Sequence, residues 1–298
     1  MLSILIPTYN YNIFPLVTIL NREALTLGID FEITCLDDGS KEFHFENNEI
    51  NSLNNCTYTI LKKNIGRSAI RNSLAKNAKF ENLLFLDADV MPIDETFISN
   101  YLQYIRYDYE VIYGGILYQK SKPKLNERLR WTYGISRESL DANQRNQNNY
   151  ISFLTLNFLI KKVVFKTVNF NESIPNLRHE DTLFSFNLKQ NQIPVKHIDN
   201  PVYHLGLESS TIFLKKSEES LIGLKYLVNN NLINKNYVRL STVYCKLKKT
   251  RLHTIFLFLF NKIEFLVIKQ ITGKNPSLFL FDLYRLAYYI QINSKKNA

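Results

Sequence analysis

LFLDADV, residues 84–90, joins an apolar run to two aspartates that stand two positions apart. The run suits a buried strand, because short segments of large apolar residues are typical of the inner strands of a sheet. A buried carboxylate is costly unless it is paired or bound to a metal. We therefore expect Asp87 and Asp89 to lie where the strand ends, at the rim of a cleft.

The segments around this stretch predict a layered α/β fold. Apolar runs predict strands at residues 2–6, 31–36, 56–61 and 83–87, and helical spacing predicts helices at 12–27 and 67–79. Strands that alternate with helices favour a mostly parallel sheet, in which ligands bind beyond the carboxyl ends of the strands. The polar sequences PTYN, DDGS and DAD follow three of these strands, so we expect them to meet at one edge.

The middle of the chain continues this pattern less regularly. We expect strands at residues 111–118 and 150–160, with a polar loop and one helix between them at 120–148. A helix is predicted at 178–190, and a strand with a turn follows at 195–206.

The two aspartates of the opening stretch are candidate metal ligands. Two carboxylates at i, i+2 beside a strand end can bind one divalent cation, and Mg²⁺ and Mn²⁺ favour such oxygen ligands. The pattern alone is weak, because paired aspartates also occur on solvated surface loops. The apolar strand before it and the polar strand ends around it favour a binding site here.

The sequence NIGRSAIRN, residues 64–72, is a second candidate. Gly66 would let the backbone approach a phosphate closely at the start of a helix. Arg67 and Arg71 share one helix face, which suits a phosphate or a carboxylate partner. A solvated helix face with ordinary ion pairs is the other interpretation, and this segment alone favours it.

Two later segments also allow two interpretations each. Glu180 and Asp181 open a helix, where acids cap the N-terminus, and an acid in this position also fits a general base. His204 follows the apolar sequence PVY and fits either a hydrogen-bonded, half-buried histidine or a ligand of a metal or phosphate.

Taken in order, SILIPTYN, DDGS, NIGRSAIRN, LFLDADV and HEDTLFSFNLKQ resemble the motifs of the family 2 glycosyltransferases, over about residues 1–206. The resemblance implies the GT-A fold, an α/β nucleotide-diphospho-sugar transferase domain with a Rossmann-like mixed sheet flanked by helices. It implies an inverting transfer from a nucleotide-diphosphate sugar donor, with Mn²⁺ or Mg²⁺ as cofactor. The acceptor would be a glycan or a lipid-linked glycan, in the synthesis of a bacterial polysaccharide or another glycan.

The resemblance also implies roles for particular residues. At the donor nucleotide it places Pro7, Thr8, Tyr9, Asp38, Gly66, Arg67, Arg71, Asp87 and Ala88. Asp38 would accept a hydrogen bond from a base such as uracil. Asp89 would bind the metal, with Asp87 and His204 beside it. Asp181 would be the catalytic base, Glu180 would hold the acceptor or orient the site, and residues 155–165 would line the acceptor side.

The last third of the chain carries all the excess positive charge. Residues 211–298 contain 15 Lys and Arg and 4 Asp and Glu, whereas the whole chain has a net charge of +10. We therefore expect a catalytic domain at 1–210 and a basic, helical extension at 211–298. Residues 244–269 and 278–290 join basic residues to apolar runs, which suits an anionic membrane surface or packing on the catalytic domain or a second subunit.

The remaining features predict a compartment. The three cysteines are far apart and form no CxxC, which favours a reducing compartment. The sequence MLSILIPTYN lacks the charged start and long apolar run of a signal peptide, and no window is apolar enough to span a membrane. We expect a cytoplasmic enzyme, peripheral on the inner face of the cytoplasmic membrane if the extension binds lipid.

Three rival functions fit the sequence less well. A sugar nucleotidyltransferase usually opens with a glycine-rich loop, and ILIPTYN contains no glycine. A nucleic-acid-binding protein is suggested by the isoelectric point of 9.3, but here basic residues mix with apolar runs and not with a recognition motif, so we expect no nucleic-acid partner. A domain that only binds nucleotide sugars would not need all of the motif acids, which are present. The donor sugar, the acceptor and the oligomeric state stay open.

Overall fold

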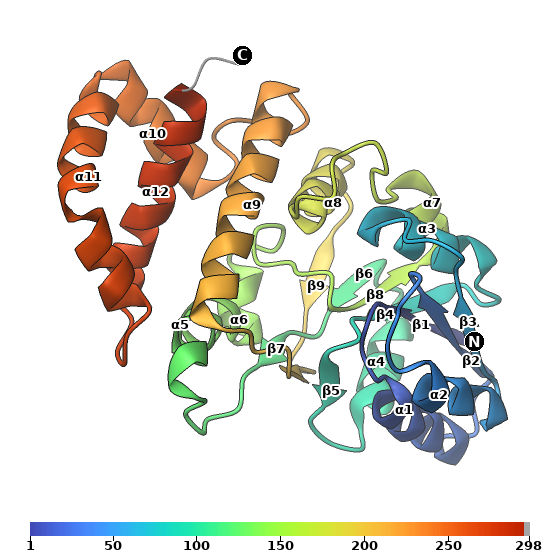
Figure 1. Ribbon diagram of the computed structural model, residues 1–298. Coiled ribbons are helices and arrows are strands. Elements are labelled where there is room, and N and C mark those ends of the chain that lie inside the picture. Colours follow the sequence, from blue (N-terminus) through green and yellow to red (C-terminus); the bar gives the residue numbers. More distant parts are fainter. Residues whose placement is uncertain (295–298) are drawn as a thin grey trace. The chain divides into compact units, whose positions relative to one another are not determined.

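The strand that leads to the two aspartates is β4 (Asn82–Leu86), the central strand of a seven-stranded mixed sheet (Figure 1). The computed structural model describes residues 1–294. The strand order is β3-β2-β1-β4-β8-β6-β9. The other strands are β1 (Leu2–Thr8), β2 (Phe31–Asp37), β3 (Cys56–Ile60), β6 (Val111–Tyr113), β8 (Asn157–Lys161) and β9 (Val195–His197). Strands β1 to β4 pair in parallel, whereas β8 is antiparallel to both β4 and β6.

Helices cover both faces of this sheet. Figure 1 shows α1 (Phe14–Thr26) and α4 (Phe97–Ile105) below it, and α3 (Arg67–Asn77), α7 (Lys162–Thr167) and α8 (Glu180–Gln190) above it. The core on the α8 side is rich in aromatic rings. Phe85 of β4 stacks on Phe158 of β8 at 4.9 Å between centroids, and Phe170 stacks on Phe184 of α8 at 4.4 Å. Such pairs contribute about 0.5–1.5 kcal/mol each beyond the area they bury. The contact of Phe158 with Phe184, at 5.9 Å between centroids, holds α8 against the sheet.

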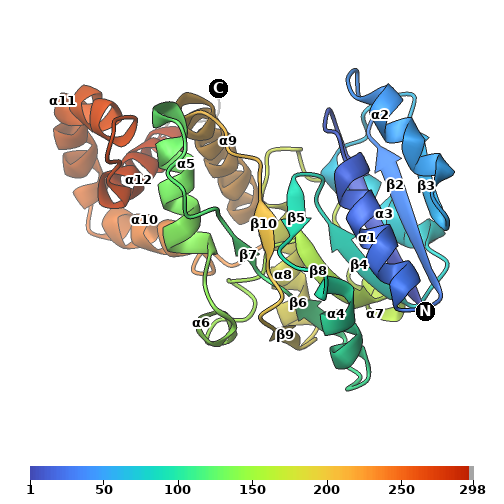
Figure 2. The ribbon, with the colours of Figure 1, turned by 90° about the horizontal axis from the view of Figure 1, so that it is seen from below.

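A smaller sheet continues the chain beyond the aspartates. Its order is β5-β10-β7, with β5 at Val90–Pro92, β10 at Val202–His204 and β7 at Ile116–Leu117 (Figure 2). Strand β5 begins directly after Asp89, and it pairs with β10 in antiparallel register, so that Val90 faces His204. This pairing brings a residue from far along the sequence next to the DAD segment.

The remaining elements are short helices and a set of longer C-terminal helices. The short ones are α2 (His44–Asn48), η1 (Glu49–Ser52), η2 (Leu125–Glu127), α5 (Arg128–Tyr133), the π-helix η3 (Gly134–Glu138) and α6 (Ala142–Asn146). The longer ones are α9 (Ser210–Asn229), α10 (Arg239–Lys249), α11 (Leu252–Ile271) and α12 (Leu278–Ser294). Across residues 1–294, every helix is too short or too polar to cross a bilayer.

The chain divides into two compact units. Unit 1 comprises Met1–Tyr118, Glu138–Ile174 and Glu180–Gly206, and it holds both sheets. Unit 2 comprises Gln119–Arg137, Pro175–His179 and the chain from Leu207 onward, and it is helical. Its core joins α5, α9, α11 and α12 through buried residues such as Leu129, Leu214, Phe260, Phe281 and Tyr284. The predicted division of roles at residue 210 stays a prediction.

The predicted architecture of a mixed α/β sheet flanked by helices, with further C-terminal helices, is confirmed. The expectation of one strand at 111–118 is wrong, because the chain turns at Gly114 and at Gly115, whose φ of 95° suits only glycine, and then enters the second sheet. The strand expected at 150–160 begins only at Asn157. The segment 120–148 contains two α-helices, α5 and α6, where one was expected.

Candidate active site

The carboxyl ends of β1 and β2 are held together by short polar contacts. The Asp38 amide donates to the carbonyl oxygen of Thr8 at 2.9 Å, which extends the parallel pairing beyond β2. One turn further, the Asn10 amide donates to the Ser40 hydroxyl at 2.7 Å, and Asn10 accepts from the Lys41 amide at 2.8 Å. Direct hydrogen bonds therefore join the segments PTYN and DDGS, which the sequence predicted to meet at one edge.

The two aspartates of DDGS are buried, and each accepts hydrogen bonds from neighbouring groups. Asp37 accepts from the Ser40 amide at 2.7 Å and from the Tyr58 hydroxyl at 2.5 Å. Asp38 accepts from the amides of Ile65 at 2.6 Å and Gly66 at 3.0 Å. Asp38 thus fixes the loop that opens α3. A carboxylate oxygen can accept two hydrogen bonds, so the predicted contact of Asp38 with a nucleobase stays a prediction.

The start of α3 needs glycine at residue 66. Gly66 has φ 88° and ψ 164°, a conformation that side chains with a Cβ rarely adopt, and it caps α3 without a side chain. The residues that follow, Arg67 and Arg71, lie one helical turn apart and both point toward Glu180. The helix start, the arginines and α8 are therefore parts of one site.

Arg71 is the centre of this site. Its Nη2 donates to Asp87 Oδ1 at 2.7 Å, and its Nη1 lies 3.7 Å from Glu180 Oε1. Its guanidinium carbon lies 5.4 Å from the centre of the Phe170 ring, and only 5% of its side chain is exposed. Such burial would be costly for an unpaired cation. The sequence allowed Arg71 to be a ligand for a phosphate or a carboxylate, or part of a solvated helix face. The structure pairs it with carboxylates at the end of β4 and the start of α8.

Asp181 follows Glu180 in the first turn of α8 and has a different environment. Its Oδ1 accepts from the Thr182 amide at 2.6 Å and from the Thr182 hydroxyl at 3.3 Å. Burial, and after it the charge of Glu180, raise the pKa of the Asp181 carboxyl to about 6 against the opposing effects of the Thr182 contacts and Arg71. A carboxyl group that titrates near neutral pH suits proton transfer.

Asp89 lies on the other side of the DAD turn, beside β10. Its Oδ2 is 3.4 Å from His204 Nε2, and its carbonyl accepts from the Leu205 amide at 2.8 Å. A Cβ on Gly206 would lie 2.0 Å from Asp89 Oδ2, so only glycine leaves that carboxylate its position. The His204 ring also lies against Tyr118, at 5.4 Å between centroids.

The remaining predicted residues lie along the same edge. Pro7 is part of β1 and pairs with Leu36, whereas Tyr9 follows the strand and is half exposed. Ala88 is half buried between the two aspartates. Within residues 155–165, β8 occupies the middle of the sheet and Phe158 is fully buried, whereas Val163 is exposed, so the predicted lining of the acceptor side stays a prediction.

Sequence reasoning missed several residues of this site. Burial and the charge of Asp89 raise the pKa of the Tyr11 phenol, so Tyr11 lies close to that carboxylate. Tyr118 contacts His204 and is bonded through its hydroxyl to Glu138. Gly206 had one signal, its place two residues after His204, which ends its strand. The other residues had none, because they come from separate segments that only the fold brings together.

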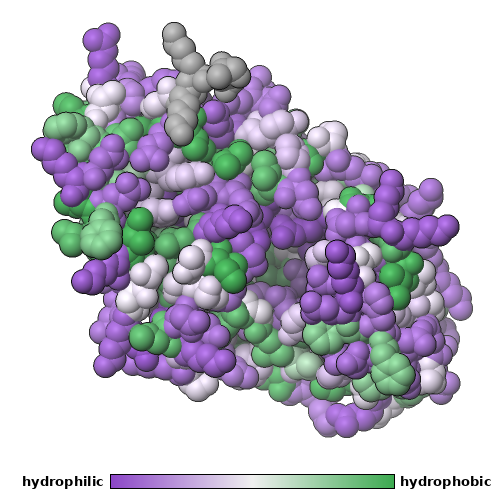
Figure 3. Space-filling view, viewed as in Figure 1, coloured by the Kyte–Doolittle hydropathy of each residue, from purple (hydrophilic) through white to green (hydrophobic). Residues whose placement is uncertain are grey.

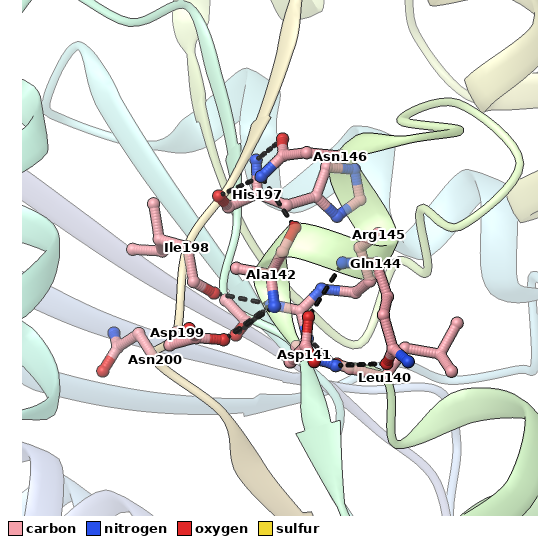
Figure 4. A network of polar contacts seen from close by, with 12 residues as sticks. Leu140, Asp141, Ala142, Gln144, Arg145, Asn146, His197, Ile198, Asp199 and Asn200 are labelled. Atoms are coloured by element: carbon pink, nitrogen blue, oxygen red, sulfur yellow. Dashed lines mark hydrogen bonds and ion pairs between the residues drawn. The ribbon is translucent and has the colours of Figure 1, made fainter.

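A buried polar network positions the segment that carries His204 (Figure 4). The Arg145 side chain of α6 is 2% exposed, and its Nη2 donates to the carbonyls of Ile198 at 2.6 Å and Gly114 at 3.2 Å. The Asn146 side chain pairs with both backbone groups of His197. A Cβ on Gly115 would lie 2.3 Å from Arg145 Nη1, which explains the glycine pair in VIYGGILY. The network therefore ties β9 and the start of β10 to the end of β6.

The side chains around DAD supply few ligands for a divalent cation. Within residues 1–294, no three His, Cys, Asp or Glu side chains are grouped as a ready metal site. Asp87 is engaged by Arg71, which leaves Asp89 and His204 as the pair of side chains that converge. The Asp89 carboxylate suits Mn²⁺ or Mg²⁺ when phosphate oxygens of a substrate supply further ligands.

A mixed sheet with acids and arginines gathered at its carboxyl edge, and with helices on both faces, is the arrangement expected of a nucleotide-diphospho-sugar transferase with the GT-A fold. Residues 3–168 match the family model described as "Glycosyl transferase family 2", so the chain belongs to this family of enzymes. The predicted family, fold class and enzyme class are thereby confirmed. No curated protein matches the sequence.

Solved structures of S. aureus TarS are similar to this chain. One covers 74% of this chain at 19% identity and a TM-score of 0.51, and the match spans 39% of that TarS chain. The fragment TarS 1–349 covers 98% of this chain at 14% identity and a TM-score of 0.52, with 90% of the fragment matched. The same fragment in complex with UDP gives 15% identity and a TM-score of 0.50. At these identities the likeness shows the fold.

Proposed function

We propose that this family 2 glycosyltransferase moves a sugar from a nucleoside diphosphate donor to an acceptor hydroxyl with inversion at the anomeric carbon. The main support is the pairing of Arg71 with both Asp87 and Glu180, which brings the end of β4 and the start of α8 together at one point. Asp181, whose pKa burial raises to about 6, lies next to Glu180 in that site. The UDP complex of TarS 1–349, a protein of similar fold, supports a nucleoside diphosphate as the leaving group.

The residues divide the work of donor binding. Thr8 and Tyr9 at the end of β1, with Asp38 at the end of β2, form the side that receives the base and ribose. The amides at the start of α3, behind Gly66, and Arg67 at the surface suit the diphosphate, because a helix N-terminus favours negative charge. Arg67 is 41% exposed and able to turn toward a ligand, whereas Arg71 is held by carboxylates.

Transfer then takes one displacement. Asp181 removes the proton of the acceptor hydroxyl as its oxygen forms a bond to the anomeric carbon of the sugar. The bond from that carbon to the diphosphate oxygen breaks on the opposite face, and its electron pair leaves with the nucleoside diphosphate. A positioned base contributes about 10²–10⁴-fold in rate. Arg71 holds Asp87 and Glu180 in place, so that the acids around the reacting centre keep their geometry.

A divalent cation would be held by Asp89 with His204 beside it. When bound, it would offset the negative charge that grows on the leaving diphosphate. Gly206 serves this group by leaving room for the Asp89 carboxylate. Tyr118 and the paired strands β5 and β10 keep His204 facing Asp89.

The proposed acceptor and location rest on the sequence. We propose a glycan or lipid-linked glycan as acceptor in the synthesis of a bacterial polysaccharide, and an anionic membrane surface as the place of work. The support is the resemblance of the motifs and the basic, apolar composition of residues 244–269. Unit 2 supplies that surface, as its helices α10 and α11 contain this stretch.

The test of the donor is calorimetric titration of UDP, GDP and dTDP, each with and without Mn²⁺, on wild type, Asp89→Ala and the control Asp94→Ala. Asp94 is an exposed acid in the same part of the chain. Binding of one nucleotide that needs Mn²⁺, is lost in Asp89→Ala and survives in Asp94→Ala supports the proposal. Binding of none of the three nucleotides would overturn it.

A further inference from the structure

Helix α11 of unit 2 has a broad apolar face that stays exposed. Its exposed large apolar residues are Leu252, Ile255, Phe258, Leu259, Ile263, Phe265 and Leu266. Phe265 is 77% exposed, and Phe258 and Leu266 are 62% exposed each. Isolated apolar residues on a surface are ordinary, but so many on one helix mark an interaction site.

The spacing shows that these residues form one continuous face. Positions 252, 255, 259, 263 and 266 recur at intervals of three or four, and 258 and 265 lie two turns apart beside them. The buried residues of the helix, Phe260, Val267 and Ile271, lie on the opposite side and pack in the core with α12. Helix α11 is therefore apolar on both sides, and only one side is covered within the described part of unit 2.

The charges on the exposed face have one sign. Lys262 and Lys269 are exposed on it, and Lys262 Nζ lies 4.5 Å from the centre of the Phe258 ring. The single acid of the helix is Glu264, which is half buried. Its charge is one of the causes, after burial, that raise the pKa of Tyr284 of α12. Residues 239–271 contain seven Lys and Arg and one acid. On the face that Figure 3 shows, green and purple side chains lie side by side in the region of this helix.

We propose that this face of α11 docks on an anionic membrane surface, with the helix parallel to the bilayer plane. Leu, Ile and Phe side chains would enter the boundary between headgroups and acyl chains, and the two lysines would extend to anionic headgroups. The inference rests on the proposed membrane location and names the part of the chain that achieves it. The helix lies on the surface and does not span, in line with the lengths and apolarity of the described helices.

A second copy of the chain is a poorer occupant for the same face. A two-fold symmetric contact would place the face against itself, with Lys262 and Lys269 of both copies brought together. No acid on the face would compensate them, and burying like charges is costly. Anionic lipid supplies both the apolar layer and the opposite charge.

The first experiment sediments the full chain with vesicles of phosphatidylcholine alone or mixed with phosphatidylglycerol. We expect binding to the anionic vesicles that weakens as salt rises from about 0.1 M to 1 M, since the Debye length falls from ~10 Å to ~3 Å. The double variant Phe265→Ser, Leu266→Ser should bind about tenfold more weakly or worse, because two exposed apolar side chains are lost. Its control is Phe45→Ser, Ile151→Ser, which removes two equally exposed apolar residues of unit 1.

The charge arm uses Lys262→Gln, Lys269→Gln against Lys76→Gln, Lys166→Gln, four exposed lysines of which only the first pair lies on α11. We expect the first pair to lose binding to anionic vesicles severalfold, with an unchanged melting temperature, and the second pair to bind as wild type. Undiminished binding by both α11 variants would overturn the docking face and leave the membrane location standing. No binding by the wild type at low salt would overturn both, while the transferase reaction would be unaffected.

The orientation is tested with tryptophan in a Trp131→Phe background, as Trp131 is the only tryptophan. Ile255→Trp and Leu266→Trp lie eleven residues apart, about 16 Å along a helix. If α11 lies flat, brominated lipids quench both tryptophans to the same extent. Quenching of one alone would contradict the parallel orientation. A shift from dimer to monomer in the sedimentation velocity of the Phe265→Ser, Leu266→Ser variant would show that the face binds a second copy.

Discussion

Arg71 Nη2 lies 2.7 Å from Asp87 Oδ1, and this contact joins a helix start to the end of the central strand. Its other nitrogen lies near Glu180, so a single guanidinium connects α3, β4 and α8. Removing it would leave Asp87 without its cation and Glu180 with Arg67 alone, at 3.8 Å. Loss of Arg71 would therefore affect both the stability of the fold and the geometry of the catalytic site.

Arg71→Gln is expected to lower the free energy of unfolding by about 3 kcal/mol, the low end for breaking a buried pair, because Asp87 is 31% exposed. Denaturant unfolding measures this. Arg22→Gln, which breaks the exposed pair with Glu95, is the control and should cost less than about 1 kcal/mol. Equal losses in the two variants would show that Arg71 has no special place in the site.

The rate of transfer should depend on pH through Asp181. Its pKa is raised to about 6 by burial, so the base is protonated and inactive below that pH. We expect kcat to rise about tenfold per pH unit below 6 and to level off above it. Asp181→Asn should abolish transfer but keep donor binding in calorimetry. A rate that stays flat between pH 5 and pH 8 would contradict the assignment of the base.

The same shift predicts how stability depends on pH. The folded pKa lies above the ordinary value of 3.8, so the fold favours the protonated form of Asp181. The stability that this form contributes is complete below 3.8 and is lost as pH rises through about 6. Asp181→Asn mimics the neutral form and should therefore melt higher than wild type at pH 7.5. At pH 4 the two should melt alike, and a deficit of the variant at both pH values would refute the linkage.

Gly206→Ala is expected to weaken metal-dependent nucleotide binding without unfolding the protein. The new Cβ would meet Asp89 Oδ2 at 2.0 Å and displace the carboxylate, whose side chain can rotate away. Calorimetry with Mn²⁺ should show binding at least tenfold weaker, a loss of about 1.4 kcal/mol. Gly28→Ala is the control: with φ 62° and no atom within 4 Å of the new Cβ, it should cost stability and leave binding intact.

The sequence predicted those parts of the fold that repeat a local pattern. β1, β2, β4, α1 and α3 lie close to their expected ranges, because apolar runs, helical spacing and turn residues specify them locally. The segment 111–160 was predicted poorly. There, Gly114 and Gly115 accommodate Arg145 and Asn157, polar groups that are far apart in sequence. Close approach of that kind leaves no periodic signal.

For the candidate site, the motif residues were predictable and their partners were not. The sequence indicated Arg71 as a ligand for a phosphate or a carboxylate, and the fold pairs it with Asp87 and Glu180. Tyr11 and Gly206 were not predicted, since their proximity to Asp89 depends on how β1 and β10 end. Such neighbours follow from tertiary pairing and not from spacing along the chain.

Unit 2 is held together by contacts between segments that the ribosome makes at very different times. Arg137 bonds to Asp282 at 2.8 Å, and Arg128 donates to the carbonyl of Lys274 at 2.8 Å. At about 5–20 residues per second, a ribosome needs roughly 7–30 s to travel from one member of the Arg137–Asp282 pair to the other. Until then Leu129 of α5 lacks the α12 residues that share its core. A nascent chain that stops before α12 is made therefore exposes the apolar side of α5 to chaperones and proteases.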